Sequence, residues 1–318
     1  MHRIFTILSL LMLAVACQEQ ESPPRDPYEV IPSHALANAE INDFQALRNQ
    51  LEESKLYEDL QGIPAIPLLR RQLDYYFQGV PEDTLQGFLE SRRLIASLHR
   101  SGAESYDWLV VTSRDRVLEK VLSEDLQDRG AELKSRPYGG VEVFSLEQAS
   151  DGLEKPPLHL ATLEGELMLA STKRGLLEEA IRQEQSQSRL SSRQDFAKLL
   201  RTRSDDIPVN IFFHLQKSEQ LLQELLPEGN FEQISTLGSW AQADLQLTPS
   251  KLFLSGLLLV PEQENSYLRC FTSIDTHEPK SPSIVPADPG FWLHFNLGNA
   301  SQFYRNYQDH LRQKGDLE

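Results

Sequence analysis

The stretch LHLATLEGELMLASTKRGLLEEAI, residues 158–181, contains the unit that decides the fold. Residues 158–163 and 166–170 are short, mostly apolar stretches, which predicts two strands, and Glu164-Gly165 between them predicts a tight turn. Strands joined by so short a turn are antiparallel. A helix with one apolar face is predicted next, from residues at helical spacing: Leu176, Leu177, Ala180 and Ile181.

Strands followed by helices recur along the chain. Further strands are predicted over residues 35–42, 94–98, 108–111, 209–215 and 291–297. Hairpins are predicted at Gly139-Gly140 and Pro249-Ser250, because these residues favour short turns. Hydroxyl side chains that can cap a first turn predict helix starts at Thr112, Ser218 and Ser301. The predicted fold is α+β: a mostly antiparallel sheet of repeated strand-strand-helix units, with amphipathic helices on one face.

The composition is that of an ordinary folded protein. Hydrophobic residues make up 40% of the 318 residues and charged residues 25%, which excludes a disordered tail and a collagen. The 31 basic residues against 47 acidic residues give a net charge of −16. Nucleic acid is therefore not expected as a partner, because its phosphates require a basic face. Past residue 16, no apolar run is long enough to span a bilayer.

Residues 1–16 have the parts of a secretory signal peptide. The basic segment Met1-His2-Arg3 precedes the apolar residues 4–15, and small residues come directly before Cys17. This arrangement resembles the lipobox of bacterial lipoproteins, although Ala14 stands where the lipobox prefers Leu. The resemblance implies that Cys17 is acylated, and two or three acyl chains anchor a protein stably to a membrane. The alternative is an ordinary signal peptide cut nearby, with Cys17 incidental.

The remaining chain divides by composition and pattern. Residues 17–28 comprise the acylated cysteine and a polar, flexible tether. Residues 29–282 are predicted to form the α+β domain, and residues 283–318 the start of a possible second repeat. By resemblance to lipoprotein sorting in Gram-negative bacteria, Gln18 after the cysteine implies the outer membrane. The protein is then expected to be periplasmic or surface-exposed.

Two distant segments share the pattern behind the possible repeat. Val30-Ile31-Pro32 precedes the first predicted strand, Ile284-Val285-Pro286 precedes the last, and a helical pattern follows each strand. The last helical pattern runs on toward Glu318. Either the second copy is rudimentary or the chain is part of a longer protein, and the alternative is coincidence of a common strand–helix pattern.

Several of these motifs together resemble a known family. They are GELMLAS at residues 165–171, LLEEAI at 176–181, Asp195-Phe196 and VNIFF at 209–213. With the Ile-Pro segment before the first strand, they resemble a Bacteroidota envelope lipoprotein family built on a domain of unknown function. The likeness extends from about residue 27 to the end. It implies an envelope location and this architecture, and it implies no activity.

Two predicted strands carry aromatic and polar side chains on the same face. Period-2 alternation places Phe212, His214 and Gln216 together on one strand. It likewise groups Trp292, His294 and Asn296 on the other. If the strands are neighbours, this mixed face could bind a sugar or a peptide through its rings and polar groups. The alternatives are a face that packs against the rest of a longer chain and a face that meets only water.

Motifs for catalysis are missing from the sequence. It has no zinc-protease, nucleophile-elbow, phosphate-loop, dinucleotide or calcium-loop motif, so no catalytic residue and no cofactor is predicted. His214 and His294 would need a further ligand to bind zinc, so no metal site is predicted. Cys270 lies in a mixed apolar stretch and is expected to be a buried, unreactive thiol.

The predicted function follows from these observations. We expect a lipid-anchored, non-enzymatic envelope protein with a binding or scaffold role. Its partners are expected to be the membrane, through Cys17, and an envelope protein or glycan of unknown identity. The alternative is an envelope hydrolase whose site is assembled from residues distant in sequence, and converging histidine and carboxylate side chains would favour it.

Overall fold

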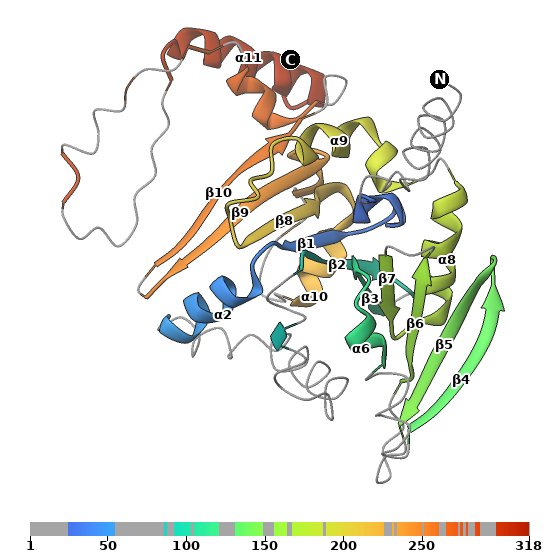
Figure 1. Ribbon diagram of the computed structural model, residues 1–318. Helices are drawn as coiled ribbons and strands as arrows, with labels where there is room; N and C mark the ends of the chain where they lie inside the picture. The colour runs from blue at the N-terminus through green and yellow to red at the C-terminus, as the bar shows by residue number, and fades with distance from the viewer. Residues whose placement is uncertain are drawn as a thin grey trace, which may run out of the picture.

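A single ten-stranded antiparallel sheet forms the centre of the fold (Figure 1). The computed structural model describes residues 25–54, 86–87, 92–102, 105–120, 131–148, 156–163, 167–186, 189–225, 231, 234–249, 251–260, 265–272, 274–275, 278, 284–286 and 297–317. In spatial order the strands are β10, β9, β8, β1, β2, β3, β7, β6, β5 and β4. With the helices that accompany it, this sheet confirms the predicted α+β class.

The strands have the following bounds: β1 (Ala37–Ile41), β2 (Leu94–Arg100), β3 (Tyr106–Ser113), β4 (Ala131–Tyr138), β5 (Val141–Gln148), β6 (Leu158–Leu163), β7 (Leu167–Ser171), β8 (Val209–His214), β9 (Trp240–Thr248) and β10 (Lys251–Leu259). The described helices are α2 (Phe44–Glu53), α6 (Arg116–Lys120), α8 (Arg174–Gln185), α9 (Gln194–Leu200), α10 (Glu219–Leu225) and α11 (Ala300–Lys314). Short 3₁₀ turns include η1 (Pro27–Glu29), η3 (Leu190–Ser192) and η6 (Tyr267–Phe271).

Strand β1 occupies the middle of the sheet and joins its two halves. It pairs antiparallel with β2 along one edge and with β8 along the other. Strands β8, β9 and β10 form one half, and the strands from β2 to β4 form the other. The N-terminal strand therefore lies between segments that come much later in the sequence.

The hairpins form where the turn residues predicted them. Gly139 and Gly140 join β4 to β5 with φ angles of 58° and 83°. A two-residue turn with positive φ at both positions matches the right-handed twist of the strands it joins, and glycine adopts these angles without strain. Strands β9 and β10 pair over their full length, from Trp240 opposite Leu259 to Thr248 opposite Lys251.

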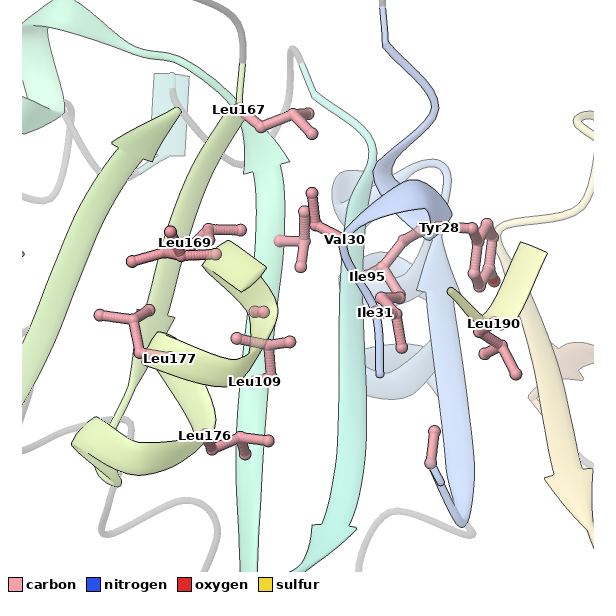
Figure 2. Close-up of a cluster of buried hydrophobic side chains, with 14 of the residues drawn as sticks. Tyr28, Val30, Ile31, Ile95, Leu109, Leu167, Leu169, Leu176, Leu177 and Leu190 are labelled. Atoms are coloured by element: carbon pink, nitrogen blue, oxygen red, sulfur yellow. The ribbon is translucent and has the colours of Figure 1, made fainter. Parts of the chain in front are cut away.

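One face of the sheet, here called the inner face, carries the main hydrophobic core. Alternate residues of the central strands point to it, among them Ile95, Leu109 and Leu169 (Figure 2). Helix α8 covers these residues with Leu176 and Leu177, and the N-terminal segment adds Tyr28, Val30 and Ile31. The Val-Ile-Pro segment before β1 is thus buried in the core.

Four aromatic rings pack together on the inner face of the half of the sheet that contains β8 and β9. Phe196 of α9 lies at the centre, with its ring centroid 5.3 Å from Tyr28, 5.3 Å from Phe212 and 4.8 Å from Trp240. All four side chains are fully buried. Their tilted and edge-to-face packing adds to the stabilisation gained from burying the ring surfaces.

The second face of the sheet is also covered, which differs from the predicted one-sided arrangement. Leu221 of α10 packs with Leu36 and Leu98, and Trp108 and Phe213 pack against this cluster. The strands that carry these residues have apolar side chains at both parities, so each face needs a cover. Helix α10 supplies that cover directly after β8.

Three helix ends differ from the prediction. The side chain of Asn299, rather than Ser301, caps the start of α11 and accepts the backbone N–H of Gln302 (3.0 Å). The carboxylate of Asp115, rather than Thr112, accepts the backbone N–H of Val117 (2.8 Å) at the start of α6, because β3 continues through Ser113. Helix α11 does not run on to the end of the chain. It ends at Gly315 (φ 84°), whose N–H bonds to the carbonyl of Arg312. A left-handed glycine is a common way to end a helix.

The C-terminal helix packs on η6 through aromatic rings. Phe303 of α11 lies 5.0 Å from Phe271, measured between ring centroids, and Tyr307 lies 6.0 Å from Tyr267. The amide of Asn306 donates to the carbonyl of Cys270 (3.1 Å). The Cys270 thiol is buried, as predicted, and burial raises its pKa.

Candidate functional site

The predicted mixed face divides between described and undescribed residues. Trp292, His294, Asn296 and the acylation site Cys17 lie outside the described residues, so their roles stay predictions. Phe212 and His214 do share one side of β8, as the alternation predicted, but that side is the inner face and the expectation of an open face is wrong there. The alternation fixes parity only, and α9 with Trp240 covers this side.

His214 is buried against the ring of Trp240. Its ring lies 4.5 Å from that of Trp240, and it is 1% exposed. Burial, and then the nearby charges of Lys217 and Arg193, lowers the pKa of His214 to about 4. The residue is therefore neutral at pH 7. Within the described part of the chain, no group of three His, Cys, Asp or Glu side chains could hold a metal ion.

The carboxylate of Glu40, on the central strand β1, is buried inside the protein. The hydroxyl of Tyr28 donates to its Oε2 (3.1 Å), the guanidinium of Arg93 contacts Oε1, and Nη1 of Arg203 lies 3.9 Å from Oε2. Burial raises the pKa of Glu40 against the opposing effect of the two arginines. Burial, with the nearby Glu40 charge, also raises the pKa of Tyr28 well above its ordinary value, so its hydroxyl stays protonated and donates.

The loop that carries Arg203 is fixed by two asparagines on neighbouring strands. The amide of Asn42, just after β1, donates to the carbonyl of Ile207 (2.9 Å), and the amide of Asn210 donates to that of Ser204 (2.9 Å). The Glu40 network thereby connects η1, β1, the start of β2 and the loop before β8. These contacts hold together segments that are distant in sequence, so the network has a structural role.

A second polar group lies toward the opposite end of the same strands. Oγ of Ser97 lies 2.7 Å from Nε2 of His99, and the His34 ring packs edge-on against His99 with centroids 4.9 Å apart. Nδ1 of His34 lies 3.3 Å from a carboxylate oxygen of Glu179 on α8. The amide of Asn38 lies beside Ser97, across the β1–β2 pair, and has no hydrogen-bond partner among the residues that the structure describes.

This geometry resembles a nucleophile and its base, and the burial argues for a structural role. A catalytic serine must reach its substrate, whereas Ser97 is 0% exposed. Burial lowers the pKa of His99 to about 3, which makes its imidazole a weak base. Ser97 and His99 therefore form a hydrogen-bonded pair inside the core.

The one strongly exposed apolar surface among the described strands is β10. Five large side chains of this strand are 36–61% exposed: Leu252, Phe253, Leu254, Leu257 and Leu258. They alternate between the two faces of the sheet, so both faces of β10 are apolar. β10 is also the edge of the sheet, and none of the described strands pairs with its outer side (Figure 1).

Two glycines lie where β10 and the segment leading into β9 approach each other closely. A Cβ at Gly256 would lie 1.9 Å from the carbonyl oxygen of Gln242, so only glycine fits there. A Cβ at Gly238 would similarly lie 2.5 Å from the carbonyl oxygen of Leu259. The two glycines let the backbones on either side of this pairing approach closely, so a side chain is not tolerated at either position.

The opposite edge of the sheet has a different composition. Strand β4 carries Glu132, Lys134 and Arg136, and Pro137 has no N–H to offer a neighbouring strand. Nζ of Lys134 lies 2.7 Å from a carboxylate oxygen of Glu147 on β5. Charges and proline are the usual protection of an edge strand against pairing. Among the described strands, one edge of the sheet is therefore blocked, and the other is open.

Comparison with known proteins identifies the family. Residues 89–318 match the family described as "Protein of unknown function (DUF3352)". The chain belongs to this family. No curated protein and no solved structure matches it. The family match thus covers β2 to α11, including the open edge strand, and assigns no activity to it.

The hairpin predicted at Pro249-Ser250 implies that β10 is a strand, but it does not indicate that this strand is exposed. The signal is present in residues 252–259, LFLSGLLL, which contain no charge and are apolar at both parities. Such a strand is typical of the interior of a sheet. A strand of this kind at the end of the last hairpin of a meander is exposed unless something else covers it.

The Glu40 network predicts a specific loss of stability. Glu40→Gln removes the buried negative charge that the guanidinium of Arg93 contacts and that Arg203 faces at 3.9 Å. Breaking a buried pair from one side costs about 3–5 kcal/mol, which denaturant unfolding at pH 7 measures. Glu132→Gln on the exposed edge β4 is the matched control and should change the free energy of unfolding little. A loss below about 1 kcal/mol for Glu40→Gln would mean that Glu40 is neutral in the folded protein.

The neutral state of His99 predicts a pH dependence of stability. Between pH 6.5 and about 3, the unfolded chain protonates this residue and the folded protein does not. The unfolded state then binds more protons, so stability falls as the pH is lowered through this range. His99→Gln should therefore show a smaller fall in Tm from pH 6.5 to 4 than the wild type. Ser97→Ala keeps the titrating group and should keep the wild-type slope, and equal slopes for all three proteins would contradict the prediction.

Proposed function

We propose that the protein is a lipid-anchored protein of the bacterial envelope that binds another polypeptide by strand addition at β10. The observation that carries the proposal is the open apolar edge of the sheet. An exposed edge strand offers a row of backbone donors and acceptors to an incoming strand. The leucines and Phe253 beside that row offer apolar contacts to its side chains.

The chemistry of β10 favours a polypeptide over a glycan. A sugar needs several polar side chains to orient its hydroxyls. Along β10 the only charged side chain is Lys251, at the start of the strand, and the only hydroxyl is that of Ser255. An extended chain with apolar side chains would satisfy the backbone and cover the leucines at once.

The contrast between the two edges supports a functional role for the open one. A protein that leaves a long apolar edge uncovered risks aggregation, and β4 has the charges and the proline that prevent it. The same chain lacks this protection along β10. An edge that is regularly occupied by a partner has no need of it.

The membrane tether of this proposal rests on the sequence. The basic start, the apolar segment and the small residues before Cys17 support acylation of that cysteine, and Gln18 supports an outer-membrane location. No helix in the described part of the chain is long and apolar enough to cross a membrane. Acyl chains on Cys17, followed by a polar tether, would hold the sheet close to the bilayer surface.

The anchor is tested by one substitution. Wild-type protein expressed with labelled palmitate should carry the label and sediment with membranes. Cys17→Ser should lose the label and leave the membrane fraction or accumulate as a precursor. Cys270→Ser removes the buried thiol and should keep the label. Wild-type protein found wholly in the aqueous phase without label would refute the anchor.

Strand addition is tested by site-specific photo-crosslinking in intact cells. A photo-reactive amino acid in place of Phe253 should give a discrete crosslinked protein product, because this side chain lies beside the incoming strand. The same amino acid in place of Ser135, exposed on β4, is the matched control and should give none. Adding Leu257→Lys should remove the product, since a charge on the apolar strand opposes pairing. Equal crosslinking from both edges would contradict the proposal.

A further inference from the structure

We infer that the polypeptide bound at β10 is a second copy of this chain, paired antiparallel with it about a two-fold axis at Ser255. This inference rests on the proposed function and names its partner. The two sheets would then join edge to edge into one continuous sheet. Three features of the structure support it: the self-complementary sequence of β10, the arrangement of its faces and the blocked edge at β4.

The sequence of β10 is self-complementary when it is read against itself. Antiparallel pairing centred on Ser255 places Leu252 opposite Leu258 and Phe253 opposite Leu257 of the other copy. Leu254 then lies opposite Gly256, and the single charge, Lys251, lies opposite Leu259 at the outer end. Every large apolar residue of the central part meets an apolar residue or glycine, and like charges are kept apart. Aromatic and aliphatic cross-strand pairs of this kind stabilise a sheet.

The faces of the two copies match in this register. The pairing with β9 places Leu257 beside Gln242 and so on the inner face, and Phe253 shares its parity. Leu252 and Leu258 have the other parity and lie on the second face. Each predicted pair therefore consists of residues from the same face, as a two-fold axis perpendicular to the sheet requires. Shifting the register by one residue would oppose residues from different faces.

The difference between the two edges explains why pairing would stop at two copies. Joining β10 to β10 consumes the open edge of each chain. The remaining edges are the two β4 strands, with their charges and Pro137. An interface that uses the same patch on both copies is closed, so it gives a dimer and no fibre.

Charge sets the expected salt dependence. Each chain carries a net charge of −16, so two copies repel one another over distances up to the screening length. The contact itself is apolar and contains only Lys251 from each copy. The dimer should therefore tighten as salt is raised from 20 to 500 mM, roughly the range over which screening becomes short-ranged. A contact held by opposite charges would weaken instead.

Disulfide trapping tests the axis directly. Ser255→Cys in the full acylated chain, in detergent micelles with a mild oxidant, places two thiols across the axis from each other. Opposed Cβ atoms in such a pair are about 4.5–5.5 Å apart, close to the reach of a disulfide. Ser255→Cys should give at least roughly tenfold more crosslinked dimer than Lys251→Cys, whose counterpart would lie opposite residue 259 and far away. Ser135→Cys on β4 should give only the wild-type background.

The mass of the protein in solution provides the second measurement. Wild-type chain should sediment as a dimer that tightens with salt, and Leu257→Lys should be a monomer with an unchanged circular dichroism spectrum. A monomeric wild type, or equal crosslinking from positions 251 and 255, would overturn the inference. If Phe253 nevertheless crosslinks to a different protein, strand addition stands and only the second copy is refuted. If neither the photo-reactive residue at position 253 nor the cysteine at position 255 gives a crosslinked product, the proposed function fails as well.

Discussion

The pairing of β1 with both β2 and β8 is the constraint on which the rest of the structure depends. Among the described strands, no other pair connects the half of the sheet that ends at β10 with the half that ends at β4. Both hydrophobic clusters straddle this junction. On the inner face, Ile95 of β2 and Phe212 of β8 belong to one core, and on the second face Leu98 and Phe213 are joined by Leu36, which directly precedes β1. If β1 were displaced, the two halves of the sheet would no longer be joined, and each hydrophobic cluster would be divided between them.

The central strand is also where the interior is most polar. Asn38 and Glu40 of β1 are both fully buried, although a strand in the middle of a sheet is ordinarily apolar. Glu40 meets Tyr28, Arg93 and Arg203 only in one register of β1, because each comes from a different segment around it. A shift by one residue would turn the carboxylate to the opposite face, away from all three partners. The network therefore selects the register of the strand that joins the sheet.

Local patterns in the sequence predicted the parts of the fold that are decided locally. The short apolar stretch at residues 158–163 predicted a strand and the pair Gly139-Gly140 predicted a hairpin, because strand composition and turn chemistry act within a few residues. Alternation in β8 likewise grouped Phe212 with His214. It could not say which side is covered, since the cover comes from α9 on one face and α10 on the other. The partners of Glu40 likewise come from other segments of the chain, so no pattern within β1 predicted them.

The candidate site was harder to predict, for a physical reason. Residues 252–259 have the composition of a buried strand, and nothing within the strand states that it is the last one in the sheet. Position in a sheet is a property of topology, which depends on pairings such as β1 with β8. The binding residues proposed from the sequence, by contrast, were chosen for mixed polarity. In the structure that polarity on β8 belongs to the interior, and the exposed surface is the apolar one.

The central position of β1 also has a consequence for the order of folding. Asn42, at the end of this strand, bonds to Ile207, which lies 165 residues further along the chain. During synthesis, β1 emerges early and has to wait for β8 before its second edge is paired. Contacts of such large sequence separation form slowly, because a long loop must close before they contribute any stabilisation. Until then β1 is itself an edge strand, so the chain presents an unpaired strand near its N-terminus well before the folded protein presents β10.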